Sequence, residues 1–185
     1  MYLLAYCTHV YSSLQVFGPS TAIAVADPQL TALYASTTNV IILEEDLLIA
    51  PDFFSYFKAV SDTFQSRPSE AASLLSVSAW NDNGQGRHVS DPQQLYRSDF
   101  FPGLGWMLTR SIWEELRDQW PAAYWDDWLR EPARRLDRHI IRPEVSRTYH
   151  IGKRGVSNSE FGQVTYDIQP LIINTVHLLP IYITS

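Results

Sequence analysis

Short apolar runs alternate with polar turns along most of the chain, and their spacing predicts an α/β fold. Residues 40–43 and 73–79 are mostly apolar runs of the kind that form strands buried on both faces of a sheet. Between them, apolar side chains recur at helical spacing across residues 52–66, which predicts an amphipathic helix with an aromatic core face. The order strand, helix, strand, loop, strand, helix is typical of an α/β domain.

The other expected elements follow from the same criteria. Residues 111–119 form the next expected helix, for which Ser111 is a suitable N-cap. Residues 124–130 have the pattern of a short helical turn that ends before Pro132. The remaining expected elements are strands at residues 21–26, 107–108, 140–141 and 147–151 and a helix at residues 29–35.

Composition narrows the class of protein. A chain of 185 residues with 45% hydrophobic content is long enough for one domain with a sizeable core. The net charge of −6 argues against a nucleic-acid surface, which would need clustered lysines and arginines. The single cysteine, Cys7, excludes an internal disulfide and a cysteine-based zinc site, and the five histidines have no metal-binding spacing. No run of 18 apolar residues is present, so the sequence predicts no transmembrane helix.

Three consecutive carboxylates, Glu44, Glu45 and Asp46, follow the strand predicted at residues 40–43. Strands of open α/β sheets direct their carboxyl ends toward the crevice that binds ligands. Three acids there repel one another unless a cation lies between them, and a divalent cation carrying a nucleotide diphosphate fits that requirement. The alternative is a solvated acidic turn after a buried strand, and this stretch alone does not separate the two.

A second acidic pair, Asp126 and Asp127, is framed by Trp125 and Trp128. Aromatic rings that exclude water would suit one of these carboxylates to act as a general base. Together with Tyr124, the two tryptophans offer ring faces on which a sugar can stack. The alternative is the first turn of a helix, where acids are favoured by the helix dipole.

Two glycine-containing loops are candidate ligand loops. Residues 102–105 lack the lysine and the glycine spacing of nucleotide-binding loops, so close packing of a strand against a ligand or a helix is the better interpretation. Residues 153–157 form a basic loop that either closes over a diphosphate or is an ordinary exposed turn.

Six ordered strings carry a family resemblance that covers about residues 39–162. They lie at residues 42–47 with 50–54, 78–84, 95–97 with 99–106, 125–128, 142–147 and 152–157. In this order and spacing they resemble the N-acetylglucosaminyltransferase I family, and several are shared with the related protein O-mannose N-acetylglucosaminyltransferases. The resemblance implies a nucleotide-sugar transferase fold of the A type, a Rossmann-like mixed sheet flanked by helices, incomplete in this chain.

The resemblance also implies roles for the acidic residues. Asp46 matches the direct manganese ligand of the family's acidic triplet. Glu45 matches a residue that reaches the ribose and the waters of the metal, and Glu44 matches a supporting position. Asp126 matches the catalytic base.

The donor site implied by the resemblance includes Leu104, whose backbone lies near the donor in the family. Val156 and Ser157 match a loop that orders over UDP-GlcNAc and helps to create the acceptor site. The implied reaction is a manganese-dependent, inverting transfer of N-acetylglucosamine from UDP-GlcNAc to the 2-hydroxyl of a mannose on glycoprotein glycans. One protein carboxylate suffices as the base, unlike in glycosidases, which need two.

The chain also departs from the family pattern. Residues 1–38 form a divergent N-terminal segment, residues 39–162 the catalytic core and residues 163–185 a C-terminal segment beyond the match. The family's Golgi membrane anchor, which places the enzyme on the lumenal side, is not visible in this sequence. At two positions where the resemblance implies a bridging cysteine pair in relatives, this chain has Ser76 and Ile140 instead. The alternative expectation is therefore a truncated, catalytically silent member that keeps the scaffold and at most weak nucleotide or glycan binding.

Overall fold

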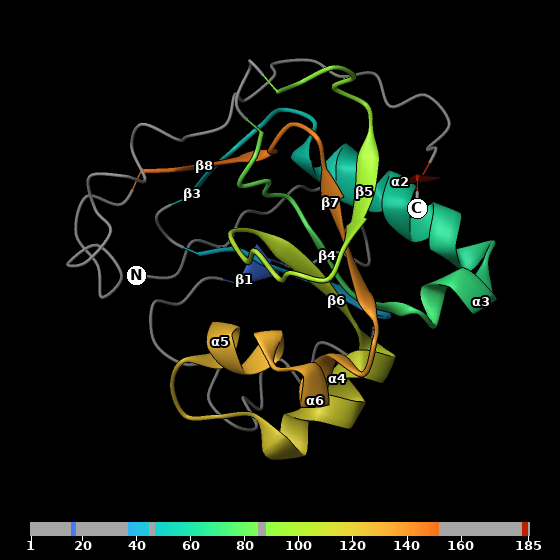
Figure 1. Cartoon of the computed structure of the whole chain (residues 1–185), viewed down its shortest axis with the longest axis vertical. Coiled ribbons are helices and arrows are strands. Elements are labelled where there is room, and N and C mark those ends of the chain that lie inside the picture. Colours follow the sequence, from blue (N-terminus) through green and yellow to red (C-terminus); the bar gives the residue numbers. More distant parts are fainter. Residues whose placement is uncertain (1–15, 18–36, 45–46, 85–87, 152–182, 185) are drawn as a thin grey trace.

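The structure is a computed structural model that describes residues 16–17, 37–44, 47–84, 88–151 and 183–184. Within these residues, one mixed sheet has the strand order β1-β2-β6-β4-β7-β5-β9, and a separate two-stranded sheet pairs β3 with β8 (Figure 1). The strands are β1 Val16–Phe17, β2 Asn39–Ile42, β3 Leu47–Ile49, β4 Leu74–Ser78, β5 Leu95–Ser98, β6 Trp106–Thr109, β7 His139–Pro143, β8 Thr148–His150 and β9 Ile183–Thr184. This α/β arrangement confirms the predicted fold class.

Helices cover both faces of the main sheet, as Figure 1 shows, with α2 and α3 on one face and α4, α5 and α6 on the other. Their bounds are α2 Phe53–Gln65, α3 Pro68–Ala71, α4 Arg110–Leu116, α5 Trp125–Arg130 and α6 Pro132–Arg135, with a 3-10 turn at Arg117–Gln119. The strands are buried on both sides, because successive residues of β2 enter different cores: Val40 and Ile42 face α4, whereas Ile41 faces α2.

The two cores differ in their aromatic residues. The core under α2 contains the buried rings of Phe53, Tyr56, Phe57 and Phe64, which confirms the aromatic helix face predicted for residues 52–66. The core under α4 and α5 is built around tryptophans, which are Trp106, Trp113 and Trp120. Large rings on both sides of a short sheet supply the apolar area that a domain of this size needs.

Helix α4 begins one residue earlier than predicted, at Arg110. Its N-cap is Thr109, not Ser111, because the Thr109 hydroxyl accepts a hydrogen bond from the Ile112 amide at 3.4 Å. Ser111 lies inside the first turn, with its hydroxyl 3.1 Å from that of Thr109. The helix also ends earlier, at Leu116, and continues as the 3-10 turn.

Apart from the two-residue strands β1 and β9, the described elements that were not predicted are β3, β5, α3 and α6. The two strands have three and four residues, and most of their positions are only partly buried or exposed, so neither has a continuous apolar run. The two helices have four residues each, and both begin at a proline. Proline suits the first turn of a helix, although in the sequence Pro68 reads as the stop of the preceding helix. The strand and helix expected at residues 21–26 and 29–35 lie outside the described residues.

Strands β4 and β7 pair in parallel, and Ser76 and Ile140 are directly opposite each other in this register. Both are buried, with 4% and 0% of their surfaces exposed. These are the two positions at which the resemblance implies a cysteine pair in relatives. The register brings them together on neighbouring strands.

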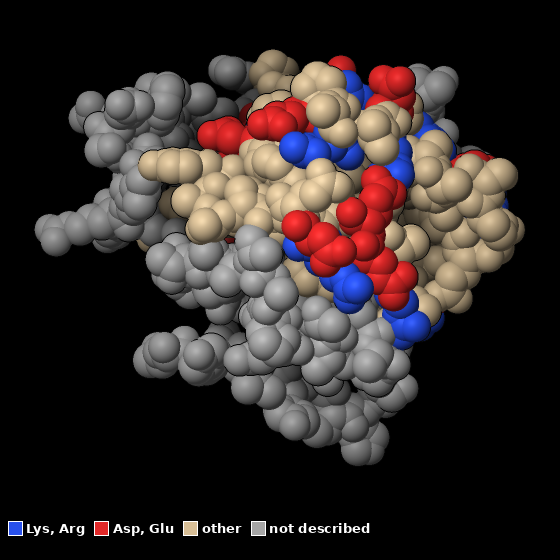
Figure 2. Space-filling view, turned by 90° about the horizontal axis from the view of Figure 1, so that it is seen from below, with Lys and Arg blue, Asp and Glu red and all other residues tan. Residues whose placement is uncertain are grey.

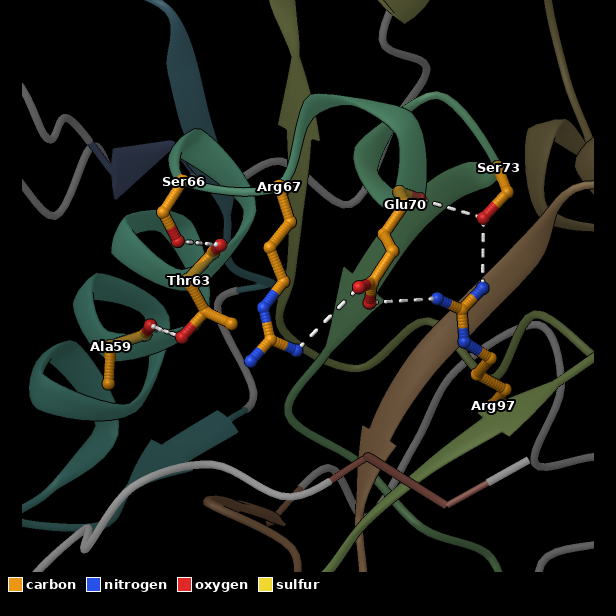
Figure 3. A network of polar contacts seen from close by, with 7 residues as sticks. All are labelled: Ala59, Thr63, Ser66, Arg67, Glu70, Ser73 and Arg97. Atoms are coloured by element: carbon orange, nitrogen blue, oxygen red, sulfur yellow. Dashed lines mark hydrogen bonds and ion pairs between the residues drawn. The ribbon is translucent and has the colours of Figure 1, made fainter.

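The end of α2 is joined to β5 by a polar network around α3 (Figure 3). Glu70 forms long ion pairs with Arg67, at 3.7 Å, and with Arg97 of β5, at 3.6 Å. Arg97 also donates to the Ser73 hydroxyl at 2.8 Å, and that hydroxyl donates to the Glu70 carbonyl at 2.7 Å. Much of this network is exposed, so we assign it the modest stabilisation of surface ion pairs.

Candidate functional site

Strands β2, β4 and β7 end at the same edge of the sheet, which we call the carboxyl edge. Strands β2 and β4 are both antiparallel to β6, and β7 is parallel to β4, so all three run in one direction. The loop at residues 103–105 leads into β6 and therefore lies at this edge as well. In open α/β sheets this is where ligands bind.

The loop at residues 103–105 has a left-handed backbone at three consecutive positions. The φ angles of Gly103, Leu104 and Gly105 are 68°, 54° and 85°. Ser78 donates to the Gly103 carbonyl at 2.9 Å, and Thr148 donates to the Leu104 carbonyl at 2.7 Å. A leucine in this conformation is strained by about 1–3 kcal/mol, and such strain persists only where the surroundings hold it. The surroundings here are the carboxyl end of β4 and the start of β8.

Glu44 is held against this loop. Its Oε2 atom accepts a hydrogen bond from the Gly105 amide at 3.0 Å. A Cβ atom on Gly105 would lie 2.8 Å from Cγ2 of Thr148, so only glycine allows the backbone to approach this closely. The interpretation of residues 102–105 as a close-packing segment is therefore confirmed, and Glu44 is fixed at the carboxyl edge.

Glu45 and Asp46 lie outside the described residues, between Glu44 and the first residue of β3. In the part of the chain that the structure describes, no group of three or more histidine, cysteine, aspartate or glutamate side chains is close enough to hold a metal ion. The assignment of Asp46 as a metal ligand stays a prediction. The same holds for Val156, Ser157 and the basic loop at residues 153–157, which also lie outside the described residues.

Asp126 and Asp127 occupy the first turn of α5. Arg130, one turn later, places its Nη1 atom 3.1 Å from Oδ2 of Asp126 and 2.7 Å from Oδ1 of Asp127. The Asp126 side chain is 41% exposed and that of Asp127 is 71% exposed. The expectation that aromatic rings exclude water from these carboxylates is thus wrong, and a guanidinium is their main neighbour.

The expectation that Trp125 and Trp128 offer ring faces to a sugar is also wrong. Trp125 stacks on Trp106 with ring centroids 5.4 Å apart, and Trp128 packs against Trp120 at 5.4 Å. Both rings therefore extend the tryptophan core. Tyr124 is different, because its side chain projects into solvent with 71% exposure from a left-handed backbone.

The same packing brings the candidate base to the carboxyl edge. Trp106 is opposite Ile42, the last residue of β2, and Trp125 stacks on Trp106. The first turn of α5, which contains Asp126, is thereby placed beside the end of the strand that leads to Glu44. On the face that carries α4, α5 and α6, which Figure 2 shows from below, acidic and basic side chains are interspersed.

A buried ion pair supports the carboxyl edge and was not predicted from the sequence. Nε of Arg147 lies 3.1 Å from Oδ2 of Asp52, and the two side chains are only 2% and 8% exposed. Arg147 also donates to the carbonyls of Val145 and Pro92, and its guanidinium packs over the ring of Tyr56. Burial raises the pKa of Tyr56, chiefly through desolvation. The backbone amide of Arg147 donates to the Ala79 carbonyl just past β4 at 2.7 Å, so this residue joins the end of β4 to the segment that precedes α2.

A second buried network fixes the segment after β7. Glu144 is 5% exposed and accepts hydrogen bonds from the amides of Ser90 and Asp91, at 2.9 and 2.8 Å. The Asn81 side chain donates to the Glu144 carbonyl at 2.7 Å, and the Asn81 amide donates to the Ser146 hydroxyl at 2.8 Å. The strings at residues 78–84 and 142–147 contain Asn81, Glu144 and Ser146 of this network. We conclude that much of the recognisable sequence around the site is structural support.

The fold and the carboxyl edge together define a mixed α/β domain of the kind that binds ligands at the ends of its strands. A family model described as GNT-I family matches residues 30–178, which is most of the chain. The chain belongs to the GNT-I family.

The chain is also similar to a named protein. It is 51% identical over 139 residues to the alpha-1,3-mannosyl-glycoprotein 2-beta-N-acetylglucosaminyltransferase of Arabidopsis thaliana. The aligned part covers 75% of this chain and 30% of that relative, so the chain spans less than a third of the relative's length. Within the described residues, no helix is long and apolar enough to cross a membrane.

Proposed function

We propose that the carboxyl edge is the donor and acceptor site of an inverting N-acetylglucosaminyltransferase. The reaction would transfer N-acetylglucosamine from UDP-GlcNAc to the 2-hydroxyl of a mannose on a glycoprotein glycan. One observation carries the proposal: Glu44, the strained loop at residues 103–105 and the helix turn with Asp126 lie at the same sheet edge. The family match over residues 30–178, a stretch that contains all three, supports the same assignment.

The residues present fit a divalent metal. Carboxylate oxygens are hard donors of the kind that manganese and magnesium prefer, and Glu44 is held at the carboxyl edge by the Gly105 amide. Asp46 would be the direct ligand, and Glu45 would reach the ribose and the waters of the metal. A bound manganese ion would neutralise the charge that builds on the leaving diphosphate.

The chain's own residues would supply the rest of the chemistry. Asp126 would accept the proton of the attacking mannose hydroxyl, for which a carboxylate must come within about 2.6–3.2 Å of that oxygen. The strained backbone at Leu104 would contact the donor, and Val156 and Ser157 would close over it. Because the metal stabilises the leaving group, no second carboxylate acting as an acid is needed, in contrast to glycosidases.

Substitution of Asp126 by asparagine tests the proposal. We expect kcat for transfer from UDP-GlcNAc to a mannose-terminated acceptor to fall at least about 10²-fold, since a general base contributes that much or more. The Asp126 side chain is 41% exposed, so the urea midpoint of unfolding should stay unchanged. Asp127→Asn is the matched control and should retain most of the activity. Wild-type turnover in Asp126→Asn would exclude Asp126 as the base.

A second candidate function is tested beside the first. In this alternative the chain is a catalytically silent member that retains the scaffold. Titration calorimetry with UDP, with and without manganese, separates the two candidates. Metal-dependent binding at micromolar concentration supports the enzyme, and no binding up to millimolar UDP supports the silent scaffold. For the enzyme we propose the lumenal side of the Golgi membrane, where the family acts.

A further inference from the structure

The guanidinium of Arg130 lies between the candidate base and the body of the protein. We propose that Arg130 is the positioning residue that fixes the orientation of the Asp126 carboxylate. This inference rests on the proposed function only for its catalytic consequence. Its structural part, a fixed carboxylate on an exposed helix turn, is testable by itself.

Arg130 is anchored by a segment distant in sequence. Its Nε atom donates to the Phe101 carbonyl at 3.0 Å, and its guanidinium lies over the Phe100 ring, 5.0 Å from the ring centroid. These contacts use one edge and one face of the planar group. Nη1 remains directed at Asp126, at 3.1 Å, and at Asp127, at 2.7 Å.

An exposed aspartate normally samples several side-chain rotamers. Asp126 is 41% exposed, and the neighbouring tryptophan rings do not confine it because they are packed into the core. The hydrogen bond from Arg130 to Oδ2 is therefore the contact that selects one rotamer. Within the described part of the chain, Oδ1 of Asp126 accepts no hydrogen bond, so this oxygen is the one available to take a proton.

Positioning of this kind has a large kinetic effect. A misplacement of a catalytic group by about 1 Å can cost about 10²-fold in rate. Lysine cannot replace Arg130 fully, because a single ammonium group cannot donate to the Phe101 carbonyl and to both carboxylates with the same fixed geometry.

Arg134 provides a matched control on the next turn. Its side chain has the same exposure as that of Arg130, 30%, and its guanidinium also lies 5.0 Å from a ring centroid, that of Trp128. Its acidic partner is Glu131, at 3.7 Å, and not Asp126. Substitution of Arg134 by alanine thus removes a comparable side chain and ring contact without touching the candidate base.

The kinetic test compares Arg130→Ala, Arg130→Lys and Arg134→Ala in the full chain with UDP-GlcNAc, manganese and a mannose-terminated acceptor. We expect Arg130→Ala to lower kcat about 10²-fold while KM for UDP-GlcNAc changes less than about twofold. Arg130→Lys should recover part of the loss, and millimolar guanidinium should rescue Arg130→Ala but not Asp126→Asn. Arg134→Ala should match the wild type. Equal losses in Arg130→Ala and Arg134→Ala, or no rescue, would assign Arg130 a merely structural role.

A second measurement does not depend on turnover. Proton–carbon couplings in the NMR spectrum report the Asp126 side-chain rotamer, which should be single in the wild type and in Arg134→Ala but averaged in Arg130→Ala. If the wild type transfers no sugar but shows this pattern, the proposed function fails and the positioning role stands. If Asp126 is averaged in the wild type, or stays fixed in Arg130→Ala, the positioning role is overturned whatever the activity.

Discussion

Two arginine–aspartate pairs near the carboxyl edge have the same nitrogen-to-oxygen distance of 3.1 Å and opposite surroundings. The pair of Arg147 and Asp52 is buried, with side chains 2% and 8% exposed, whereas Arg130 and Asp126 are 30% and 41% exposed. Charges removed from water depend on each other for most of their favourable energy, and exposed charges do not. The two pairs thus share a nitrogen-to-oxygen distance but have different roles. The buried pair supports the scaffold, and the exposed pair is available for chemistry.

The largest expected difference between the two pairs concerns Arg147. Substitution by methionine leaves the Asp52 carboxylate buried without its cation, so we expect the free energy of unfolding to fall by about 3–5 kcal/mol. Urea denaturation followed by tryptophan fluorescence measures the change. The control is Arg67→Met, whose half-exposed guanidinium pairs with Glu70 at 3.7 Å and should cost less than about 0.5 kcal/mol. Equal effects of the two substitutions would refute the contrast between buried and exposed pairs.

A disulfide engineered between β4 and β7, inside the same scaffold, is a second test of its stability. Ser76 and Ile140 are opposite each other on neighbouring parallel strands, and strand spacing of about 4.8 Å lies within the reach of a disulfide. Among the described residues the Ser76 hydroxyl has no hydrogen-bond partner, so its replacement forfeits no bond seen there. The double variant Ser76→Cys with Ile140→Cys should gain about 2–4 kcal/mol when oxidised. Reductant should remove the gain, and a gain that survives in reductant would contradict the register.

Gly105 connects the scaffold to the site. Alanine there would place a Cβ atom 2.8 Å from Cγ2 of Thr148 at a φ of 85°, so we expect Gly105→Ala to destabilise the protein by about 1–3 kcal/mol. It should also shift the amide that Glu44 accepts from, which weakens metal-dependent UDP binding. Urea denaturation and calorimetry measure the two effects. Gly103→Ala is the control for φ alone, because its Cβ atom would meet the Phe101 ring at an ordinary 3.8 Å.

The smallest effect on stability belongs to the exposed pair. Arg130→Gln should change the free energy of unfolding by less than about 1 kcal/mol, since ion pairs at this exposure contribute little. The same substitution should lower kcat strongly if Arg130 positions Asp126. A large loss of stability with kcat unchanged would reverse the roles that we assign to the two pairs.

The sequence predicted the elements whose burial leaves a continuous or periodic apolar pattern. The strands at residues 40–43 and 73–79 lie between the two cores, the helix at residues 52–66 packs on one face of the sheet, and all three elements are present. Strands β3 and β5 were missed because they are short and mostly partly exposed, so their patterns resemble those of loops. The local sequence pattern thus indicates which segments are buried, but not which strands pair.

The residues of the candidate site also divide into those that the sequence identified and those that it missed or misassigned. Glu44 and Asp126 were identified by their strings, and the structure brings both to the carboxyl edge. The roles of Trp125 and Trp128 were misassigned, because a sequence reveals an aromatic ring but not the side of a helix that is buried. Arg147 was missed because its partner lies 95 residues away. The roles of Glu45, Asp46, Val156 and Ser157 remain predictions.

The contacts that build the carboxyl edge join remote parts of the chain, with separations of 61 residues for Glu44 with Gly105 and 95 for Asp52 with Arg147. Closing long loops costs entropy before any contact compensates for it, so such contacts form late in folding. During synthesis on the ribosome, Asp52 and the loop at residues 103–105 can make their contacts with Arg147 and Thr148 only after those residues have emerged. A nascent chain stalled before that point should contain α2 and β4 but no assembled site.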